Sequence, residues 1–399
     1  MDVDLPPRKG LPDGPQATGN VFDGTVALPM AVLSREALDH NIATMARYCA
    51  DHDVLLAPHG KTTMSPQLIT RQLEAGAWAV TVATAWQARV LAHLGFRRLL
   101  VANEIVDPGS LAVVDGLLAS HDDLELYCYA DSPAALAALE KGVAAERLPR
   151  LRVLVELGLP GGRTGLRDDA AALALARSVA SGPAVFAGVA AFEGVVGGDD
   201  PEGQVDRLLR RMVTVALAAR ELDLPGPDPI VTVGGSAYFD RVVDAVPAAV
   251  GVAGYRTVLR SGCYVTHDAG MYAATSPFGD QPRTSSRLRE ALFVWAPILS
   301  RPEPGLALAG LGRRDASADA GLPVPRVIRR DGVAEPFDAT VFAVNDQHAY
   351  LRVPETSRVA VGDLVAFGIS HPCTTFDKWK GIPIVEADGS FHEIAYTYF

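Results

Sequence analysis

The chain has 399 residues, of which 49% are apolar, so it can bury a large core in two domains or in one large barrel with an appendage. Acidic side chains (47) outnumber basic ones (36), and no run rich in lysine or arginine occurs, which argues against nucleic acid as a partner. No apolar stretch is long enough to cross a bilayer, residues 1–20 lack the apolar segment of a signal peptide, and the four cysteines have no framework spacing. We therefore expect a soluble, cytoplasmic protein with reduced thiols.

The first part of the chain, residues 1–27, begins with a stretch rich in proline and glycine and is expected to form an extended or mobile arm. A short strand follows at 28–33. Ser34 is suited to cap a helix that runs to about His52, because apolar residues recur at helical spacing after it.

A regular alternation of strand-length apolar runs and amphipathic helical segments comes next. The eight runs lie at residues 54–57, 79–83, 98–102, 124–129, 151–157, 185–192, 230–233 and 257–260. Runs that are apolar on both faces and separated by helices are typical of parallel strands, so we expect an α/β fold with a (β/α)8 TIM-type barrel over residues 28–275. An open doubly wound sheet is the alternative, but no GxGxxG motif follows the first strand.

After about residue 276 the helical periodicity fades. Short β-type runs occur between turn residues at 291–295, 306–309, 324–328, 339–344, 350–353 and 364–367. They predict a second, mostly antiparallel β domain over residues 276–399, to which the strand at 28–33 could contribute.

Lys61 is the first candidate for chemistry. It stands in VLLAPHGKTTMSP (54–66), where Pro58 and Gly60 stop an apolar strand. A lysine just past the end of a buried strand can act as the nucleophile in Schiff-base chemistry. The alternative is an ordinary surface lysine in a loop.

Two turns of small residues follow the seventh and eighth barrel strands. The first, VGGSAY, contains Gly234, Gly235 and Ser236, and the second, RSGCY, contains Ser261, Gly262 and Cys263. Loops after these two strands often hold a phosphate in TIM-type barrels, because backbone N–H groups and hydroxyls can surround it. Each turn alone could also be a simple strand-to-helix connection.

A lysine after the first barrel strand would adjoin these turns once the barrel closes, which is the layout that pyridoxal phosphate needs. The aldehyde of that cofactor condenses with an amine while its phosphate is fixed at the far end. Arg163, in LPGGRTGL after the fifth strand, could supply a cation to the ring oxygen of the cofactor or to a substrate carboxylate. It could equally be a loop arginine in a surface ion pair.

The segments PHGKT, GGRTG, GGS and SGCY together resemble the fold-type III pyridoxal-phosphate enzymes, whose amino-terminal domain is like that of alanine racemase. From about Leu28 onward the chain is similar to the branch with D-serine dehydratase and D-threonine aldolase, most specifically in SHPCTTFDKW (370–379). The resemblance implies that Lys61 carries the cofactor and that Arg163 contacts its phenolic oxygen. The remaining residues that it implies or allows for cofactor binding are Gly234, Gly235, Ser236, Ser261, Gly262, Cys263 and Tyr264.

The same resemblance implies a divalent metal beside the cofactor, bound by a His-x-Cys pair in dehydratases and by a His-x-Asp pair in aldolases. In this chain the pair is His371 and Cys373. Thiolate and imidazole ligands favour zinc over manganese or magnesium, and two protein ligands would leave positions for water and a substrate hydroxyl. Taken without the resemblance, the motif fits a buried cysteine and a capping histidine better.

One segment departs from the branch, since relatives often follow the lysine with Thr-His, whereas this chain has Thr62, Thr63 and Met64. Substrate choice therefore cannot be carried over directly. Several other residues stay open between a pocket role and a structural one, namely His59, His267, His348, Asp315, Asp319, Tyr238 and Tyr264.

The function expected from these features is a lyase acting on a D-3-hydroxy amino acid. Elimination of water from D-serine or D-threonine, giving a 2-oxo acid and ammonia, is the leading hypothesis. The first alternative is retro-aldol cleavage to glycine and an aldehyde, and the second is a racemase or a cofactor-binding protein without turnover. By analogy with the fold type we expect a homodimer.

Overall fold

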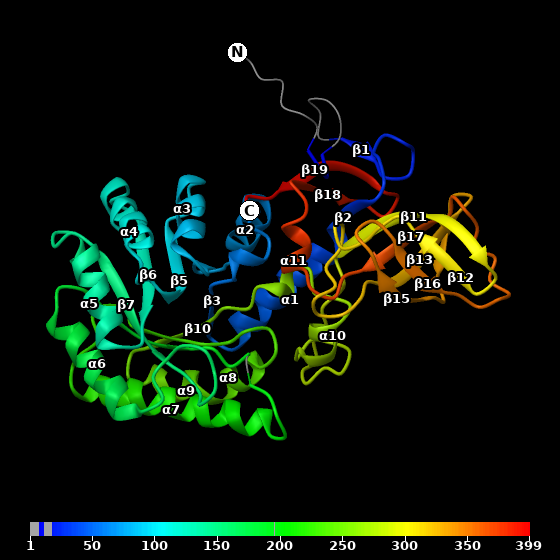
Figure 1. Cartoon of the computed structure of the whole chain (residues 1–399). Coiled ribbons are helices and arrows are strands. Elements are labelled where there is room, and N and C mark those ends of the chain that lie inside the picture. The colour runs from blue at the N-terminus through cyan, green and yellow to red at the C-terminus, as the bar shows by residue number, and fades with distance from the viewer. Residues whose placement is uncertain (1–7, 12–17, 195) are drawn as a thin grey trace, which may run out of the picture. The chain divides into compact units, whose positions relative to one another are not determined.

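The computed structural model describes residues 8–11, 18–194 and 196–399, which form two compact units (Figure 1). The barrel unit comprises Met45–Lys61 and Ile69–Gly262. The β unit comprises the described residues of Met1–Thr44 together with Thr62–Leu68 and Cys263–Phe399. The domain limits expected from the sequence stay a prediction, because a compact unit need not coincide with a domain that folds alone.

The barrel unit contains an eight-stranded parallel sheet. Its strands are β3 (Leu55–Leu56), β4 (Val80–Val82), β5 (Arg98–Glu104), β6 (Glu125–Ala130), β7 (Leu151–Leu157), β8 (Val185–Ala191), β9 (Ile230–Thr232) and β10 (Arg256–Leu259). They pair in the order β3-β10-β9-β8-β7-β6-β5-β4. The two ends of this order are joined where Trp78 donates its backbone N–H to Leu56 O at 2.7 Å and Thr81 donates to Pro58 O at 2.9 Å. The curled, TIM-type parallel sheet expected from the apolar runs is confirmed.

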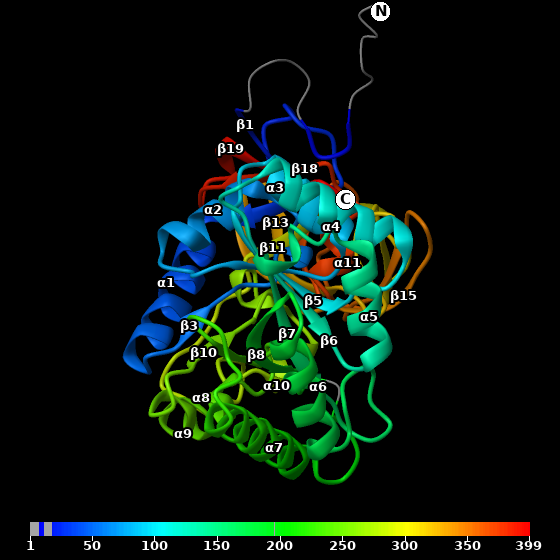
Figure 2. The same ribbon diagram turned by 90° about the vertical axis from the view of Figure 1, so that its left-hand side faces the viewer.

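Helices lie outside these strands (Figure 2). They are α3 (Ala85–His93), α4 (Pro108–Ser120), α5 (Pro133–Gly142), α6 (Asp169–Ser181), α7 (Pro201–Glu221), α8 (Phe239–Ala245) and α9 (Pro247–Gly251), while α2 (Pro66–Glu74) extends over both units. Five of them begin at a side chain that accepts the backbone N–H three residues further on. These caps are Thr84, Asp107, Ser132, Asp168 and Asp200. Short polar residues therefore fix where each helix begins and hence the length of the loop before it.

Inward-facing residues of the barrel strands form a core that ends in carboxylates. Leu100, Tyr129 and Leu154 belong to this buried cluster. Residues two apart on a strand share a face, so Glu156 follows Leu154 on the same side. The carboxyl ends of the middle strands thus present acidic side chains inside the barrel, which the sequence analysis did not anticipate.

The β unit contains an eleven-stranded sheet. Its strands are β1 (Gly19–Asn20), β2 (Met30–Ser34), β11 (Leu292–Glu303), β12 (Leu306–Ala309), β13 (Val324–Arg330), β14 (Val333–Pro336), β15 (Thr340–Val344), β16 (Ala349–Arg352), β17 (Leu364–Gly368), β18 (Gly381–Val385) and β19 (Ser390–Tyr396). All pairs are antiparallel except β2 with β18. The mostly antiparallel second domain is confirmed, and β2 pairs within its sheet.

The remaining helices are α1 (Arg35–Asp51), which runs from the β unit into the barrel unit, and the short α10 (Met271–Thr275) and α11 (Cys373–Phe376). The α11 segment is anchored by Phe376 and Trp379, which are buried in the core of the β unit. The Trp379 indole also donates a hydrogen bond of 2.9 Å to Asp315 O. Residues just before α11 are therefore held by a packed core.

The expected N-terminal arm falls partly on residues 1–7 and 12–17, which lie outside the described residues. In the described part, Gly19 and Asn20 form β1 and pair with β19, and Lys9 Nζ lies 2.7 Å from Asp315 Oδ1. Among the described helices, none combines the length and the apolar character needed to span a membrane.

Candidate functional site

Three neighbouring strands bring Lys61 and the two small-residue turns to one end of the barrel unit. Lys61 lies in the 3-10 turn Gly60–Thr62, which is the next element after β3. Strand β10 pairs in parallel with β3 on one side and with β9 on the other, so the residues after all three strands emerge at the same end. The structure thus brings together the candidate lysine, Gly234–Ser236 after β9 and Ser261–Gly262 after β10, whose roles stay predictions.

A buried carboxylate holds the turn after β9. The Glu193 side chain is fully buried, and its carboxylate accepts the backbone N–H of Gly234 at 3.0 Å and that of Gly235. Gly234 has φ +103°, and a Cβ there would come within 2.8 Å of Leu259 Cδ2, so glycine is required. The amides of the two glycines are thus already used, which leaves Ser236 N–H as the donor of this turn without a protein acceptor in the described chain.

The turn after β10 is tied to the first one. The Ser261 hydroxyl donates to Gly235 O at 2.6 Å. The backbone N–H groups of Ser261 and Gly262 have no acceptor among the described protein atoms. Together with Ser236 they offer three amide donors from adjacent turns, and such clustered donors suit an anion.

Basic side chains surround the same end of the barrel unit. Buried Arg260 donates hydrogen bonds of 2.6 Å to Thr232 Oγ1 and to Ala191 O, and no carboxylate among the described residues pairs with it. Burial, followed by the charges of Lys61, Arg260 and Arg163, lowers the pKa of His59 well below its ordinary value. The His59 ring is therefore neutral, and its Nδ1 is buried without a partner. The three cations that act on His59 suit a bound anion such as a phosphate.

The loop that carries Arg163 is held from both sides. Asp131 Oδ2 accepts the backbone N–H of Gly165 at 3.1 Å. The Arg167 guanidinium donates to Gly162 O at 3.0 Å and to Arg163 O at 2.7 Å. Arg163 itself is exposed and stacks on the Phe192 ring, 4.6 Å from its centroid. The loop is thus fixed while the Arg163 side chain remains accessible to a ligand.

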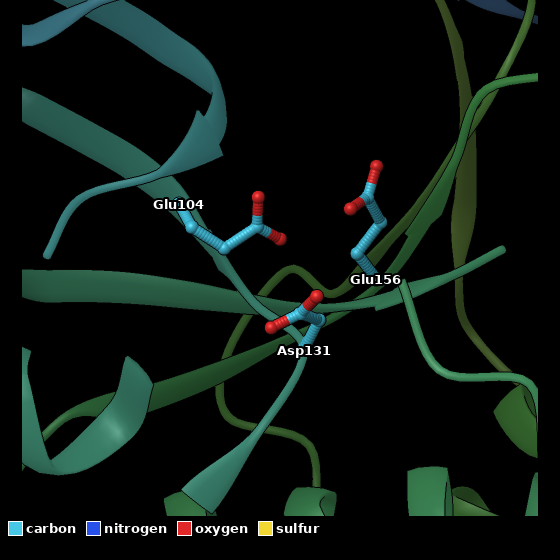
Figure 3. A group of neighbouring side chains, drawn as sticks. All are labelled: Glu104, Asp131 and Glu156. Atoms are coloured by element: carbon cyan, nitrogen blue, oxygen red, sulfur yellow. The ribbon is translucent and has the colours of Figure 1, made fainter. Parts of the chain in front are cut away.

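Glu104, Asp131 and Glu156 form an acidic cluster inside the barrel, at the ends of β5, β6 and β7 (Figure 3). One oxygen from each lies within 4.8 Å of the others. Burial first, then the charge of Glu156 and a hydrogen bond to it, raise the pKa of Glu104 to about 8. Both Glu104 oxygens are buried and receive no hydrogen bond from a donor group, so a bond to Glu156 requires a proton on one of the two carboxyls. This cluster can hold a proton near neutral pH.

The second candidate site lies in the β unit, where β17 leads into α11. His371 Nδ1 lies 2.7 Å from Asp319 Oδ2, and the other Asp319 oxygen accepts the Thr374 hydroxyl at 2.9 Å. Asp319 thereby fixes the imidazole through Nδ1 and leaves Nε2 for another partner. This is the usual arrangement of a metal-binding histidine, and a supporting role for Asp319 stays a prediction.

Cys373 lies among three hydrogen-bonding partners. Its Sγ is 3.7 Å from Cys263 Sγ and 3.4 Å from Thr62 Oγ1. The hydrogen bond with Cys263 lowers the pKa of Cys373 most, those with His371 and Thr62 lower it further, and burial opposes them. The hydrogen bond to Cys373 in turn raises the pKa of His371 to about 9. Sulfur and imidazole nitrogen are atoms that a metal can bind once they carry no proton, and His371 and Cys373 stay a predicted metal pair.

The other residues singled out by sequence lie as follows. Cys263 and Tyr264 begin a buried 3-10 turn of the β unit (Cys263–Val265), directly after Gly262. Asp315 accepts Lys9 Nζ at 2.7 Å and Gly312 N–H at 2.9 Å, which are structural contacts. His267 is buried with φ +51°, and burial lowers its pKa.

Two known protein families match different parts of the chain. Residues 33–250 match the model of the alanine racemase N-terminal domain, and residues 291–385 match that of a putative serine dehydratase domain. The chain belongs to the alanine racemase N-terminal-domain family. The resemblance seen in the sequence is thereby confirmed.

Individual relatives cover nearly the whole chain of this family member. It is 28% identical to a D-threonine aldolase of Arthrobacter sp over 92% of this chain and 91% of the relative. It is 30% identical to a D-threo-3-hydroxyaspartate dehydratase of Delftia sp. (strain HT23) over 92% of this chain and 96% of the relative. A solved alanine mutant of such a dehydratase, described as metal-free, has the same fold with a TM-score of 0.74 at 24% identity, covering 94% of this chain and 98% of that one.

The residues present fit both groups that the family implies. In the barrel unit, the amides of Ser236, Ser261 and Gly262 have no protein acceptor and lie at the same end as Lys61, as a phosphate and an aldehyde on one cofactor require. In the β unit, the sulfur of Cys373 and the imidazole of His371, which Asp319 contacts at 2.7 Å, are donor types that suit zinc. Glu193 and the acidic cluster escaped sequence analysis, because no spacing motif marks them.

Proposed function

We propose that this chain is a pyridoxal-phosphate- and metal-dependent lyase that removes water from a D-3-hydroxy amino acid, such as D-serine or D-threonine, to give a 2-oxo acid and ammonia. The observation that carries the proposal is the pairing of β10 with β3 and β9, which sets Lys61 beside two amide-lined turns. The relatives of this chain, an aldolase and a dehydratase of 3-hydroxy amino acids, support the substrate class.

The barrel unit would hold the cofactor. Pyridoxal phosphate, when bound, supplies a ring that delocalises negative charge formed at the substrate Cα. Lys61 would link to its aldehyde carbon and, once displaced by substrate, take the α-proton with its free amine. The N–H groups of Ser236, Ser261 and Gly262 would bind the phosphate, and Arg163 would bind the phenolic oxygen or the substrate carboxylate.

The β unit would hold the metal through His371 and Cys373. A divalent metal there supplies Lewis acidity to a hydroxyl oxygen, which makes that oxygen a better leaving group. The Asp319 carboxylate lies 2.7 Å from His371 Nδ1. It would keep the imidazole in the tautomer that presents Nε2 to the metal. Zinc is the metal that these ligands favour, with manganese or magnesium as the alternatives.

Retro-aldol cleavage is the competing reaction. It is supported by the similarity to a D-threonine aldolase at 28% identity, against 30% for the dehydratase. The cysteine of the His-x-Cys pair favours elimination, because the resembling aldolases have His-x-Asp. A racemase or a protein without turnover is disfavoured, since neither needs the metal pair.

Product analysis with D-threonine tests the proposal. Elimination predicts 2-oxobutyrate and ammonia, whereas retro-aldol cleavage predicts glycine and acetaldehyde. L-threonine and the Lys61→Ala variant serve as controls, and both should give neither product. If D-threonine, D-serine and D-3-hydroxyaspartate yield neither a 2-oxo acid with ammonia nor glycine with an aldehyde, the lyase proposal fails.

We also propose a homodimer in the cytoplasm, as expected from the fold type and from the sequence. Sedimentation of the purified chain would measure the mass of the assembly in solution. A particle with the mass of one 42.1 kDa chain at micromolar concentration would rule the homodimer out.

A further inference from the structure

The acidic cluster of the barrel unit, Glu104, Asp131 and Glu156, takes no part in the proposed reaction (Figure 3). Glu156 is 5% exposed, and its Oε2 has no hydrogen-bond partner among the described residues. Both oxygens of Glu104 are buried and lack a partner in the same way. Asp131 uses one oxygen to accept the backbone N–H of Gly165 at 3.1 Å. Buried carboxylate oxygens thus converge at one place with few donors to meet them.

A neutral oxygen lies at the same place. Tyr129 is 1% exposed, and its hydroxyl has no hydrogen-bond partner in the described chain. It lies opposite Glu104 in the pairing of β5 with β6, and it precedes Asp131 by two residues, so it shares the inward face of the strand. Burial raises the pKa of Tyr129, and Arg260 opposes that rise. The negative charges of Glu156 and Glu104 raise it further, so the hydroxyl faces the cluster.

A bound cation would satisfy these oxygens together. Buried carboxylates in proteins are paired or bind a metal, because an isolated charge is costly away from water. A cation also cancels the repulsion between the neighbouring carboxylates. Arg260 supplies further positive charge, since its guanidinium carbon lies 5.9 Å from the centroid of the Tyr129 ring. Three carboxylates, this arginine and one divalent ion sum to zero charge.

Calcium is the divalent ion that suits these ligands. It binds oxygen at about 2.3–2.6 Å in a flexible arrangement, so two of its ligands can lie up to roughly 5 Å apart. One oxygen from each carboxyl of the cluster lies within 4.8 Å of the others, a separation that such an ion can bridge. Magnesium demands a near-regular octahedron and usually binds only one or two carboxylates. Zinc prefers sulfur and imidazole nitrogen, which the cluster does not offer.

We propose that the barrel unit binds a calcium-sized divalent cation through Glu104, Asp131 and Glu156, with the Tyr129 hydroxyl as a neutral ligand. Glu104 and Asp131 are partly exposed, so water can reach the ion and complete its shell. The ion fixes Asp131 and, through the hydrogen bond to Gly165, the loop that follows β7.

This cation site is separate from the metal proposed at His371 and Cys373. Those two residues lie in the β unit, whereas the whole acidic cluster lies in the barrel unit. Their donor atoms also differ, because calcium binds oxygen and avoids thiolate and imidazole. Calcium therefore reports on the acidic cluster alone, and the inference does not depend on the proposed lyase reaction.

A calorimetric titration tests the site. The purified holoenzyme is dialysed against a chelator and then titrated with calcium chloride, and we expect one ion per chain. Glu156→Gln keeps the size of the side chain and removes one charge. It should weaken binding by about 10-fold or more, because the number of charged ligands sets calcium affinity. Glu221→Gln, an exposed glutamate of the same unit, is the matched control and should bind like the wild type.

Tyr129→Phe supplies a second variant, which keeps the buried ring. It should weaken calcium binding, yet the urea midpoint of the calcium-free protein should not fall, because the lost hydroxyl has no partner there. Calcium should raise the urea midpoint of the wild type and leave that of Glu156→Gln unchanged, since an ion that binds only the folded state stabilises it. The same unfolding curves show whether each variant folds.

Three results would contradict the inference. The first is a wild type that binds no calcium at millimolar concentrations. The second is binding that Glu156→Gln and Tyr129→Phe both retain unchanged, because the ion would then lie elsewhere. The third is binding that His371→Ala loses and Glu156→Gln keeps, which would place the ion in the β unit. None of them bears on the lyase proposal, which is tested separately by the products formed from D-threonine.

Discussion

Asp319 lies 2.7 Å from His371, carboxylate oxygen to ring Nδ1, and this contact orients the imidazole. Asp319→Ala should weaken zinc binding by about 10- to 100-fold, because a carboxylate that hydrogen-bonds a ligand histidine sets the tautomer and basicity of its ring. Asp319→Asn, which keeps an acceptor oxygen, should recover part of the loss. Chelator competition measures the affinity, and exposed Asp338→Ala should match the wild type. An unchanged affinity in Asp319→Ala would show that the carboxylate does not support the metal.

Lys61 is the only residue proposed to bond covalently to the cofactor. Lys61→Ala should therefore lose the near-visible absorbance of the bound cofactor together with activity. Lys61→Arg should lose both as well, because it keeps the charge but offers no reactive amine. Lys141→Ala, on an exposed helical position, is the control for general damage. If Lys61→Ala keeps the absorbance and the turnover, another group carries the cofactor.

Glu193 holds the turn that follows β9. In Glu193→Gln, the side-chain NH2 would face one of the two backbone N–H groups of Gly234 and Gly235, leaving a buried donor unpaired. Such a donor costs about 1–3 kcal/mol of unfolding free energy. Urea unfolding would measure this loss, and the cofactor should dissociate faster because the turn is less fixed. The exposed Glu221→Gln should change neither quantity. A variant as stable as the wild type would mean that the turn is held by other contacts.

The strands were predictable because a parallel barrel needs apolar residues on both faces, as at Leu151–Leu157, and such runs are visible in any one chain. The residues that contact the turns after β9 and β10 were not predictable from the sequence. Glu193 reaches a glycine 41 residues further on, and Cys263 meets a cysteine 110 residues away. Cys263 follows a Ser-Gly turn in sequence, yet the 3-10 turn that begins at it directs its sulfur toward Cys373. Side-chain direction at a turn depends on backbone conformation, which spacing alone does not reveal.

The pH dependence of stability should report on Glu104. Its pKa is raised from 4.5 to about 8, with burial as the first cause, so the folded state binds this proton more tightly than the unfolded state. The contribution is therefore present below pH 4.5 and lost as the pH rises through 8. Glu104→Gln carries no such proton. Its stability relative to the wild type should rise between about pH 5 and pH 8 and level off above that, because the wild type loses the Glu104 contribution over this range. Urea midpoints across this range would measure it, with Glu221→Gln as the control. If the stability difference between Glu104→Gln and the wild type does not change with pH, the proton is held by another carboxyl of the cluster, such as Glu156.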